Sequence, residues 1–337
     1  MLKKCLAVVL LLTLIFVMFT GCQSVTIDDE NADKVITEKN ITVVLDWTPN
    51  TNHTGIYAAK ELDYYKEVGL DVDIIQPPED NTLLMVAAGN AQFGISFQEE
   101  VLIAANEENN PLPITAIAAI LENNTSGLLS LKEKNITRFK DMEGKSFGSW
   151  GIPVFDELLK ECVRLDGGDP EKVEFVPNNA TDTLSGIRND FDAAWVYEGW
   201  DKIIADINEF ETNYLPFADM NPVFNYYTPV IVMNSNRLKA APEEQEMAEK
   251  FLQATKKGYE YAKTSPKEAA DILLKYSPEV GKDIIHASQE FISTQYYSGT
   301  WGNIDPKRWN DFFDWMKNNG IIHPESKNTA FENGLIK

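Results

Sequence analysis

The sequence is short of basic residues, and this shortage excludes one class of partner. Its 337 residues include 30 Lys and Arg against 52 Asp and Glu, which gives a net charge of −22. Binding to nucleic acid requires a concentrated basic face that neutralises phosphates, and no window of the sequence supplies one. We therefore expect no nucleic-acid partner.

The amino-terminal hydrophobic run is too short to span a bilayer as a helix. It covers residues 6–19, interrupted only by Thr13, whereas a membrane span needs roughly 20 apolar residues. A short basic head with Lys3 and Lys4 precedes it. This arrangement predicts a secretory signal peptide over residues 1–21.

The residues that follow the apolar run, Phe19-Thr20-Gly21-Cys22, resemble the lipobox of bacterial lipoproteins, in which the cysteine becomes the acylated first residue. Residues 22–40 are polar and acidic, as expected of a tether between a membrane and a folded body. We therefore expect an extracytoplasmic protein that Cys22 anchors by lipid to a bacterial cell membrane. The alternative, an uncleaved signal anchor with Cys22 unmodified, stays open.

Cysteine is scarce, with three in the chain, and the sequence also lacks the usual hydrolytic motifs. Cys5 lies in the predicted signal peptide and Cys22 is the predicted anchor, so Cys162 has no partner for an internal disulfide. Cys162 falls in a helical apolar pattern and is expected to pack in a core. There is no Gly-x-Ser-x-Gly, no His-Glu-x-x-His and no cysteine cluster with metal spacing. We expect no hydrolytic site, no metal site and no cofactor.

From Ile41 onward, short β-branched runs alternate with helical patterns, which is typical of α/β units on a mainly parallel sheet. The length favours about two domains. We predict a first lobe from residues 41–126 plus 229–337 and a second from 127–228, joined by a hinge of two chain crossings. The helices beyond Pro242 are expected to cover the first lobe. Strands are predicted at 41–46, 70–76, 93–97, 114–121, 128–132, 145–149, 173–176, 191–197, 214–217 and 230–233, and helices at 54–68, 81–88, 98–106, 155–165, 181–188, 201–210, 243–263, 267–276, 282–297 and 306–319.

Two α/β lobes on a hinge leave a cleft, and open α/β sheets bind ligands beyond the carboxyl ends of their strands. After the first predicted strand, Trp47, Asn50 and His53 have no evident local structural role. The aromatic residues at these ends favour a flat, conjugated ligand held by stacking. The other candidates at strand ends are Ser96, Gln98, Glu99, Glu100, Trp150, Gly151, Tyr197, Glu198, Trp200, Tyr226 and Tyr227.

Two of the acidic candidates have alternative roles. Glu99 and its neighbour Glu100 begin a predicted helix, where negative charge is favourable for the helix alone. Glu198 lies among aromatic residues on a turn, where it is either a helix cap or a ligand anchor. Both alternatives are left open for each position.

The sequence contains the stretches Leu45-Asp46-Trp47-Thr48-Pro49-Asn50-Thr51-Asn52-His53-Thr54-Gly55, Phe93-Gly94-Ile95-Ser96-Phe97-Gln98-Glu99, Asn124-Thr125-Ser126-Gly127 and Trp195-Val196-Tyr197-Glu198-Gly199-Trp200. Together, these four stretches resemble the ThiY-type solute-binding proteins of ABC importers. The resemblance implies a type II periplasmic-binding-protein fold that closes on a thiamine-precursor aminopyrimidine, of the formylaminopyrimidine or hydroxymethylpyrimidine type. It also implies ABC permease and ATPase partners and a monomer. By the same resemblance, Asp46 and Gly127 join the site, Glu198 meets the amino group and ring nitrogen, Trp47 stacks with Tyr197 or Tyr226, and Asn50, His53, Ser126 and Gln98 form a polar rim.

The same family resemblance includes enzymes, the thiamine pyrimidine synthases. In those enzymes a lysine and a histidine follow the third strand four residues apart, and the matching positions here are Ser96 and Glu100. Without a lysine at that place no Schiff base forms there. We therefore expect a binding protein and no enzyme. A synthase-like enzyme, or a binder of another small molecule such as riboflavin or a sulfonate, remains the alternative.

Overall fold

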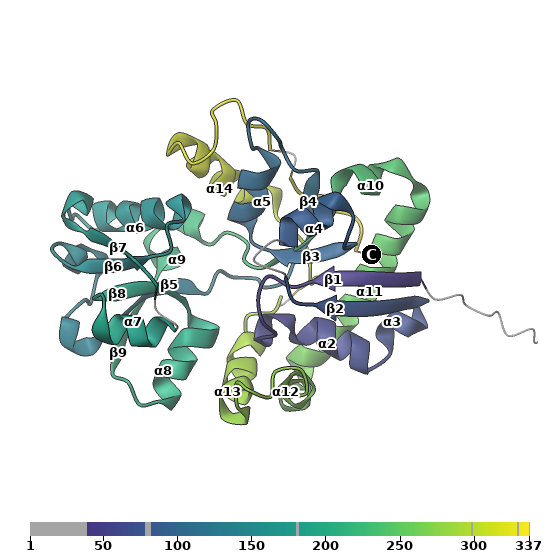
Figure 1. Cartoon of the computed structure of the whole chain (residues 1–337), viewed down its shortest axis with the longest axis horizontal. Coiled ribbons are helices and arrows are strands. Elements are labelled where there is room, and N and C mark those ends of the chain that lie inside the picture. The colour runs from purple at the N-terminus through teal and green to yellow at the C-terminus, as the bar shows by residue number, and fades with distance from the viewer. Residues whose placement is uncertain (1–38, 78–81, 180–181, 298, 329, 337) are drawn as a thin grey trace, which may run out of the picture. The chain divides into compact units, whose positions relative to one another are not determined.

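The first of two mixed sheets collects strands from both ends of the chain. The computed structural model describes residues 39–77, 82–179, 182–297, 299–328 and 330–336. The predicted signal peptide, Cys22 and most of the tether lie outside these residues. The first sheet has the order β2-β1-β3-β10-β4 (Figure 1). Its strands are β1 (Lys39–Val44), β2 (Leu70–Ile75), β3 (Phe93–Ser96), β4 (Ile114–Ala119) and β10 (Val230–Asn234).

The second sheet has the order β7-β6-β8-β5-β9 and is built from one continuous part of the chain. In each sheet, one strand is antiparallel to both of its neighbours: β10 in the first and β5 in the second. Each of these strands follows a strand of the other sheet in the chain, so no crossover within one sheet forces it to be parallel. The prediction of mainly parallel sheets missed this point. The strands are β5 (Ser126–Leu131), β6 (Ser146–Ser149), β7 (Glu174–Pro177), β8 (Ala193–Tyr197) and β9 (Thr212–Pro216).

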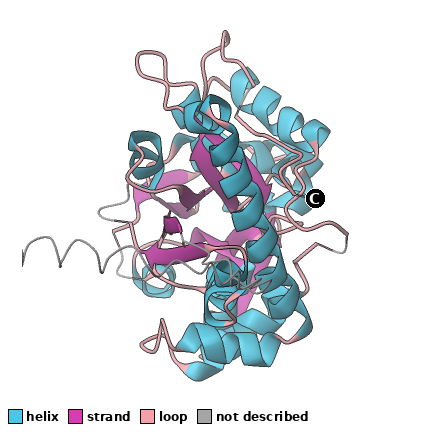
Figure 2. Ribbon diagram, turned by 90° about the vertical axis from the view of Figure 1, so that its right-hand side faces the viewer, coloured by secondary structure: helices cyan, strands magenta, loops and turns pink. Residues whose placement is uncertain are grey.

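Helices lie around the strands of both sheets (Figure 2). The helix predicted at 54–68 is divided, because Asp63 adopts a left-handed conformation with φ of 59°. The first sheet is accompanied by α2 (Thr54–Glu61), α3 (Tyr64–Glu67), α4 (Thr82–Ala88), α5 (Gln98–Ala105), α10 (Ser235–Ala240), α11 (Pro242–Thr264), α12 (Pro266–Leu274), α13 (Lys282–Ser293) and α14 (Pro306–Asn318). The second is accompanied by α6 (Pro153–Leu165), α7 (Thr183–Asn189), α8 (Ile203–Ile207) and α9 (Phe217–Met220).

The carboxy-terminal helices do more than cover the first lobe. Helix α11 packs on α2 so closely that a Cβ on Gly258 would lie 2.0 Å from the Gly55 carbonyl oxygen. Helix α13, however, also contacts α8 and the π-helical turn η6 (Glu198–Lys202) of the second lobe. The expectation that these helices serve the first lobe was therefore incomplete.

The prediction that Cys162 packs in a core is confirmed. Cys162 is a buried free thiol in α6, and burial raises its pKa. Trp301 and Trp309 are buried among other apolar side chains. Within the described part of the chain, no helix combines the length and the apolar character that a membrane crossing requires.

Candidate functional site

The turn after β1 holds its own polar side chains in place. His53 is fully buried, and its Nε2 lies 2.5 Å from Asp46 Oδ1. The Asn50 backbone N–H donates to His53 Nδ1 at 3.2 Å, so in the neutral ring the proton sits on Nε2 and is donated to Asp46. The Asn50 side chain in turn accepts from the Asn52 N–H at 2.9 Å. The expectation that Asn50 and His53 have no local structural role was wrong.

Gln98, at the start of α5, also has a structural role. Its Nε2 donates to the Trp309 carbonyl at 3.1 Å, and its Oε1 accepts from the Tyr227 N–H at 2.8 Å. Gln98 thus ties α5 to α14 and to the second chain crossing. Ser96 donates to Glu100 Oε2 at 2.7 Å, so the two positions that matched the synthase lysine and histidine are joined by a hydrogen bond.

Glu99 differs from these neighbours. Its side chain is fully buried, yet neither carboxylate oxygen makes a hydrogen bond of regular geometry among the described residues, although the Tyr226 hydroxyl lies close enough to lower the Glu99 pKa. Burial raises the pKa of Glu99 well above its usual value, and the charge of Glu100 raises it further. Natural proteins pair the great majority of buried polar atoms, so this carboxyl group requires an explanation.

Two tyrosines lie near the Glu99 carboxyl group, and a threonine lies beside one of them. Burial raises the pKa of Tyr226 and of Tyr197, and in both cases Glu99 is the next cause. The Tyr226 and Thr228 hydroxyl oxygens are buried without a regular hydrogen bond among the described residues. Thr228 is nevertheless close enough to Tyr197 to lower its pKa. We call Glu99, Tyr197, Tyr226 and Thr228 the Glu99 cluster.

The Glu99 cluster draws on both sheets. Glu99 follows β3 of the first sheet, whereas Tyr197 ends β8 of the second. The rings of Phe97 and Tyr197 lie 6.2 Å apart with an interplanar angle of 21°, which joins the two strand ends directly. Ser126 is opposite Tyr197 in the β5–β8 pair, so the two side chains share a face of the sheet. Its hydroxyl oxygen is also buried without a described partner.

Glu198 has different surroundings. It is half-buried, and burial raises its pKa. The charged groups that act on it are Lys202, which lowers its pKa, and Asp206 and Asp219, which raise it. All three belong to the second lobe. Tyr197 occupies the N-cap position of this turn and Glu198 is its first residue, so the capping alternative gains no support. Its role as ligand anchor stays a prediction, as does that of Trp200, which is half-buried on the same turn.

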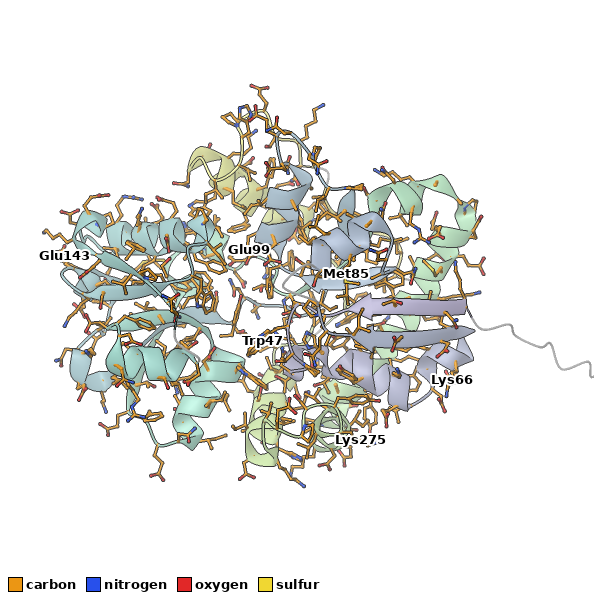
Figure 3. The ribbon with its side chains drawn as sticks, in the orientation of Figure 1. Trp47, Lys66, Met85, Glu99, Glu143 and Lys275 are labelled. Carbon is orange, nitrogen blue, oxygen red and sulfur yellow. The ribbon has the colours of Figure 1, made fainter. Side chains whose placement is uncertain are left out.

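Two of the candidate tryptophans are exposed. Trp47 is 53% exposed, and Figure 3 places it, like Glu99, between the two sheets. Trp150 is 44% exposed and meets the Phe155 ring edge-on at 6.1 Å. Such exposed rings on an otherwise well-packed protein are available for stacking on a ligand.

Three further candidates have structural roles. A Cβ on Gly127 would lie 2.4 Å from the Tyr214 ring, so the β5–β9 pair requires a glycine there. Gly151 has φ of 71°, and its N–H donates to Ser149 Oγ at 2.9 Å, which forms a turn. Tyr227 lies 4.0 Å below the Arg308 guanidinium, and its hydroxyl oxygen accepts from the Asp305 N–H at 2.8 Å.

Sequence reasoning missed Thr228 and Arg308. Thr228 adjoins the tyrosine pair that was singled out, and that adjacency was the available signal. Arg308 lies in α14 and donates to the carbonyl oxygens of Glu122 and Asn225, one at each chain crossing. An arginine in a carboxy-terminal amphipathic helix carries no sequence signal for such a role.

Two α/β lobes with polar and aromatic groups gathered where their strands end define the class of two-lobed solute-binding proteins. A family model described as NMT1/THI5 like matches residues 50–269, and the chain belongs to this family. The chain is 28% identical over 324 residues to the formylaminopyrimidine-binding protein of Halalkalibacterium halodurans, with 91% of each chain covered. It is 25% identical over 300 residues to the 4-amino-5-hydroxymethyl-2-methylpyrimidine phosphate synthase of Legionella pneumophila, with 85% of this chain and 88% of the relative covered.

The fold is also that of solved solute-binding proteins. The ligand-binding component of an ABC-type import system from Staphylococcus aureus superposes with a TM-score of 0.65 at 13% identity. The superposition covers 88% of this chain and 98% of the other. At this identity the likeness concerns the fold alone, and it agrees with the periplasmic-binding-protein architecture predicted from the sequence.

Proposed function

We propose that this protein is the extracytoplasmic substrate-binding component of an ABC importer and binds a thiamine-precursor aminopyrimidine of the formylaminopyrimidine or hydroxymethylpyrimidine type. The observation that carries the proposal is the Glu99 cluster, in which a buried carboxyl group and the Tyr226 and Thr228 hydroxyls lack hydrogen bonds of regular geometry among the described residues, beside Tyr197 at the end of a second-lobe strand. A ligand that supplies the missing hydrogen bonds would remove a cost of about 1–3 kcal/mol for each unsatisfied group.

An aminopyrimidine has the groups that such a carboxyl lacks. Its amino group donates and the adjacent ring nitrogen either accepts or, when protonated, donates, so a carboxyl group meets this edge with two parallel hydrogen bonds. Glu99 is our candidate for this contact, because its oxygens make no hydrogen bond of regular geometry among the described residues and lie beside Tyr197 and Tyr226. Glu198, which the sequence favoured, is the competing candidate. Stacking on Trp47 and Tyr197 would contribute about 0.5–1.5 kcal/mol for each ring pair beyond buried area.

The charges near Tyr197 favour a ligand without negative charge. Besides burial and Glu99, both Glu100 and Asp46 raise the Tyr197 pKa. Burial favours the neutral form of Glu99, so the negative charge near Tyr197 comes from Glu100 and Asp46. A negative local potential repels anionic ligands. The negative charge near Tyr197 therefore favours a neutral or cationic heterocycle over a sulfonate, which was one of the alternatives.

We propose that the protein binds its ligand without transforming it. The curated relatives include both a binding protein and synthases, so family membership leaves the question open. By resemblance the synthases carry a lysine at the place of Ser96, and a serine cannot form a Schiff base with pyridoxal phosphate. The hydrogen bond between Ser96 and Glu100 supports a structural use of both positions.

The proposal also includes export and assembly. Residues 1–21 would be removed as a signal peptide, and Cys22 would be acylated and anchor the chain by the tether of residues 22–40. The two lobes, residues 41–126 plus 229–337 and residues 127–228, would close on the ligand by a hinge at the two crossings. The closed monomer would then dock on an ABC permease with its ATPase.

Calorimetric titration of the purified soluble domain, residues 39–337, tests the proposed function. The ligand panel contains formylaminopyrimidine, hydroxymethylpyrimidine, thiamine, riboflavin, taurine and pyridoxal phosphate. We expect saturable binding of one pyrimidine, with the corresponding rise in melting temperature, and no binding of taurine. Absence of binding to either pyrimidine would overturn the ligand class. An absorbing adduct with pyridoxal phosphate would overturn the assignment as a binding protein.

A further inference from the structure

The turn that carries Glu198 is fastened to a helix of the first lobe by one buried serine. Ser288 lies in α13 and is fully buried. Its hydroxyl donates to the Gly199 carbonyl oxygen, in the turn η6. Its oxygen lies 2.6 Å from Thr51 Oγ1. Because the Ser288 proton is given to a carbonyl, which cannot donate, Thr51 must be the donor to Ser288.

This chain of hydrogen bonds connects the turn after β1, which carries Trp47, with the turn η6, which carries Glu198 and Trp200. Thr51 belongs to the turn after β1, between Asn50 and His53, and its carbonyl oxygen accepts from the Tyr296 hydroxyl at 3.3 Å. Gly199 directly follows Glu198. A hydroxyl that bridges the two turns sets the position of one relative to the other.

The backbone at Gly199 is pressed against α13. A Cβ at this position would lie 2.6 Å from Ile292 Cδ1 and 3.2 Å from the Phe291 ring. Real Cβ atoms do not approach this closely, so a side chain at position 199 would force the turn, the Ile292 side chain or both to shift. The close approach brings the Gly199 carbonyl within reach of the Ser288 hydroxyl.

We infer that Ser288 is a positioning residue that latches the Glu198 turn to the first lobe when the two lobes close. Thr51 and Ser288 both belong to the first lobe, so their bond persists during a hinge motion. The bond from Ser288 to Gly199 crosses between the lobes and must break whenever they separate. This hydrogen bond therefore stabilises the closed state alone, and removing it should increase the rate at which a closed complex opens. The inference assumes the hinge closure of the proposed function but concerns a residue outside the ligand contacts.

Stopped-flow kinetics with the bound pyrimidine test the latch. Ser288→Ala is expected to raise the dissociation rate about 3- to 10-fold, the usual range for one intramolecular hydrogen bond. The association rate should not change, because the ligand meets the open state. The matched control is Ser293→Ala on the same helix, whose buried hydroxyl bonds within the first lobe to Gln289 and Ala262. An unchanged dissociation rate in Ser288→Ala, or an equal rise in Ser293→Ala, would overturn the latch.

A second pair of variants tests the close approach at Gly199. Gly199→Ala should raise the dissociation rate, since the new Cβ meets the Ile292 and Phe291 side chains of α13 and strains the contact between turn and helix. Adding Ile292→Ala removes the atom that the new Cβ meets and should restore most of the wild-type rate. A double variant as impaired as Gly199→Ala would contradict the packing argument. Wild-type behaviour of Gly199→Ala would contradict it as well.

A measurement on the ligand-free protein separates the latch from the proposed function. Fluorophores are attached at Lys66→Cys and Glu143→Cys, which mark the first and the second lobe and are labelled in Figure 3. The native thiol Cys162 is buried and stays unlabelled. Ser288→Ala should shift the distance distribution toward longer values, and Ser293→Ala should not. If no pyrimidine binds but the distance distribution shifts, the proposed ligand class is wrong and the role of Ser288 is supported. If pyrimidine binds and neither kinetics nor distances respond, the latch is wrong.

Discussion

The turn after β1 and the Glu99 cluster are both polar, both buried and both placed at strand ends, yet they differ in how their polar atoms are used. In the turn, Asp46, Asn50 and His53 bond to one another and to the backbone. In the cluster, the oxygens of Glu99 and the hydroxyls of Tyr226 and Thr228 lack regular partners within the described residues. The first arrangement is complete without a ligand, and the second is not.

The difference teaches how to separate supporting residues from contacting residues in such a site. A polar side chain whose bonds are already made supports the site and contributes to folding. A buried polar side chain that makes no regular hydrogen bond lowers the stability of the fold, so another role must explain its presence. Ligand binding is the simplest such role. The comparison predicts that variants of the turn change stability and that variants of the cluster change affinity.

The largest expected effect is on affinity. Glu99→Met keeps the approximate volume and removes both oxygens, so pyrimidine binding should weaken by about 2–3 kcal/mol, or about 30- to 150-fold. The melting temperature should stay level or rise, because an unsatisfied group is removed. The matched variant Glu198→Met, measured in the same calorimeter, should lose less. A larger loss of affinity in Glu198→Met would show that Glu198, as predicted from the sequence, is the main ligand contact.

The next effect is on stability and concerns the turn. His53→Ala leaves Asp46 buried without its donor, so the free energy of unfolding should fall by about 2 kcal/mol in chemical denaturation. The control is His286→Ala, which breaks a similar pair with Asp271 at the surface, where Asp271 is 57% exposed. Surface pairs contribute about 0–1 kcal/mol, so this control should change little. Equal losses in the two variants would refute the distinction between buried and exposed pairs.

A third effect concerns pH. The folded-state pKa of Glu99 lies above its unfolded value, so the folded protein holds the proton more tightly. Its stabilising contribution is complete below the unfolded pKa, near 4.3 for glutamate, and is lost as pH rises toward the folded pKa, by about 1.4 kcal/mol per pH unit. Asp201, whose pKa burial raises to about 6, acts in the same direction between pH 4 and 6.

Glu99→Gln removes the Glu99 part of this dependence. Between pH 5 and 8 its melting temperature should fall less than that of the wild type in differential scanning calorimetry. Glu143→Gln serves as the control, because the Asp169 N–H and Lys172 lower the Glu143 pKa, so this residue titrates below the tested range and its curve should run parallel to that of the wild type. Parallel curves for Glu99→Gln and the wild type would show that the folded protein does not raise the Glu99 pKa.

The smallest effect is expected at the exposed ring. Trp47→Ala should weaken pyrimidine binding by about 1 kcal/mol, or about fivefold, because one stacking contact is lost. Its stability should stay within about 0.5 kcal/mol of the wild type, since the side chain is 53% exposed. Trp47→Phe should recover most of the affinity. A large loss of stability in Trp47→Ala would show that Trp47 supports the fold, which would contradict its role as a ligand contact.

The fold was largely predictable, because hydrophobic periodicity and turn residues are local signals. The predicted strands and most helices appear within a few residues of their observed bounds. The antiparallel strands β5 and β10 were missed, because strand direction within a sheet depends on where the chain comes from and not on the strand's own sequence. The break at Asp63 was missed because no glycine or proline marks it.

The site was predictable as a set of positions and less so as a set of roles. Positions at strand ends follow from topology, so Trp47, Glu99, Tyr197 and Tyr226 were all among the predicted candidates. Whether a polar side chain is already paired depends on three-dimensional contacts, such as Gln98 with α14 or His53 with Asp46. Ser288 was missed for the same reason, since its partners are 237 and 89 residues away.

The central claim is that the Glu99 carboxyl group contacts the ligand, and carbon-13 NMR of protein labelled at the glutamate carboxyl carbons tests it directly. The Glu99 resonance is assigned by its loss in Glu99→Gln, and the Glu198 resonance by its loss in Glu198→Gln. On saturation with the bound pyrimidine, the account predicts that the Glu99 resonance shifts and that the Glu198 resonance shifts less. A Glu99 resonance that stays fixed while that of Glu198 moves would contradict the account.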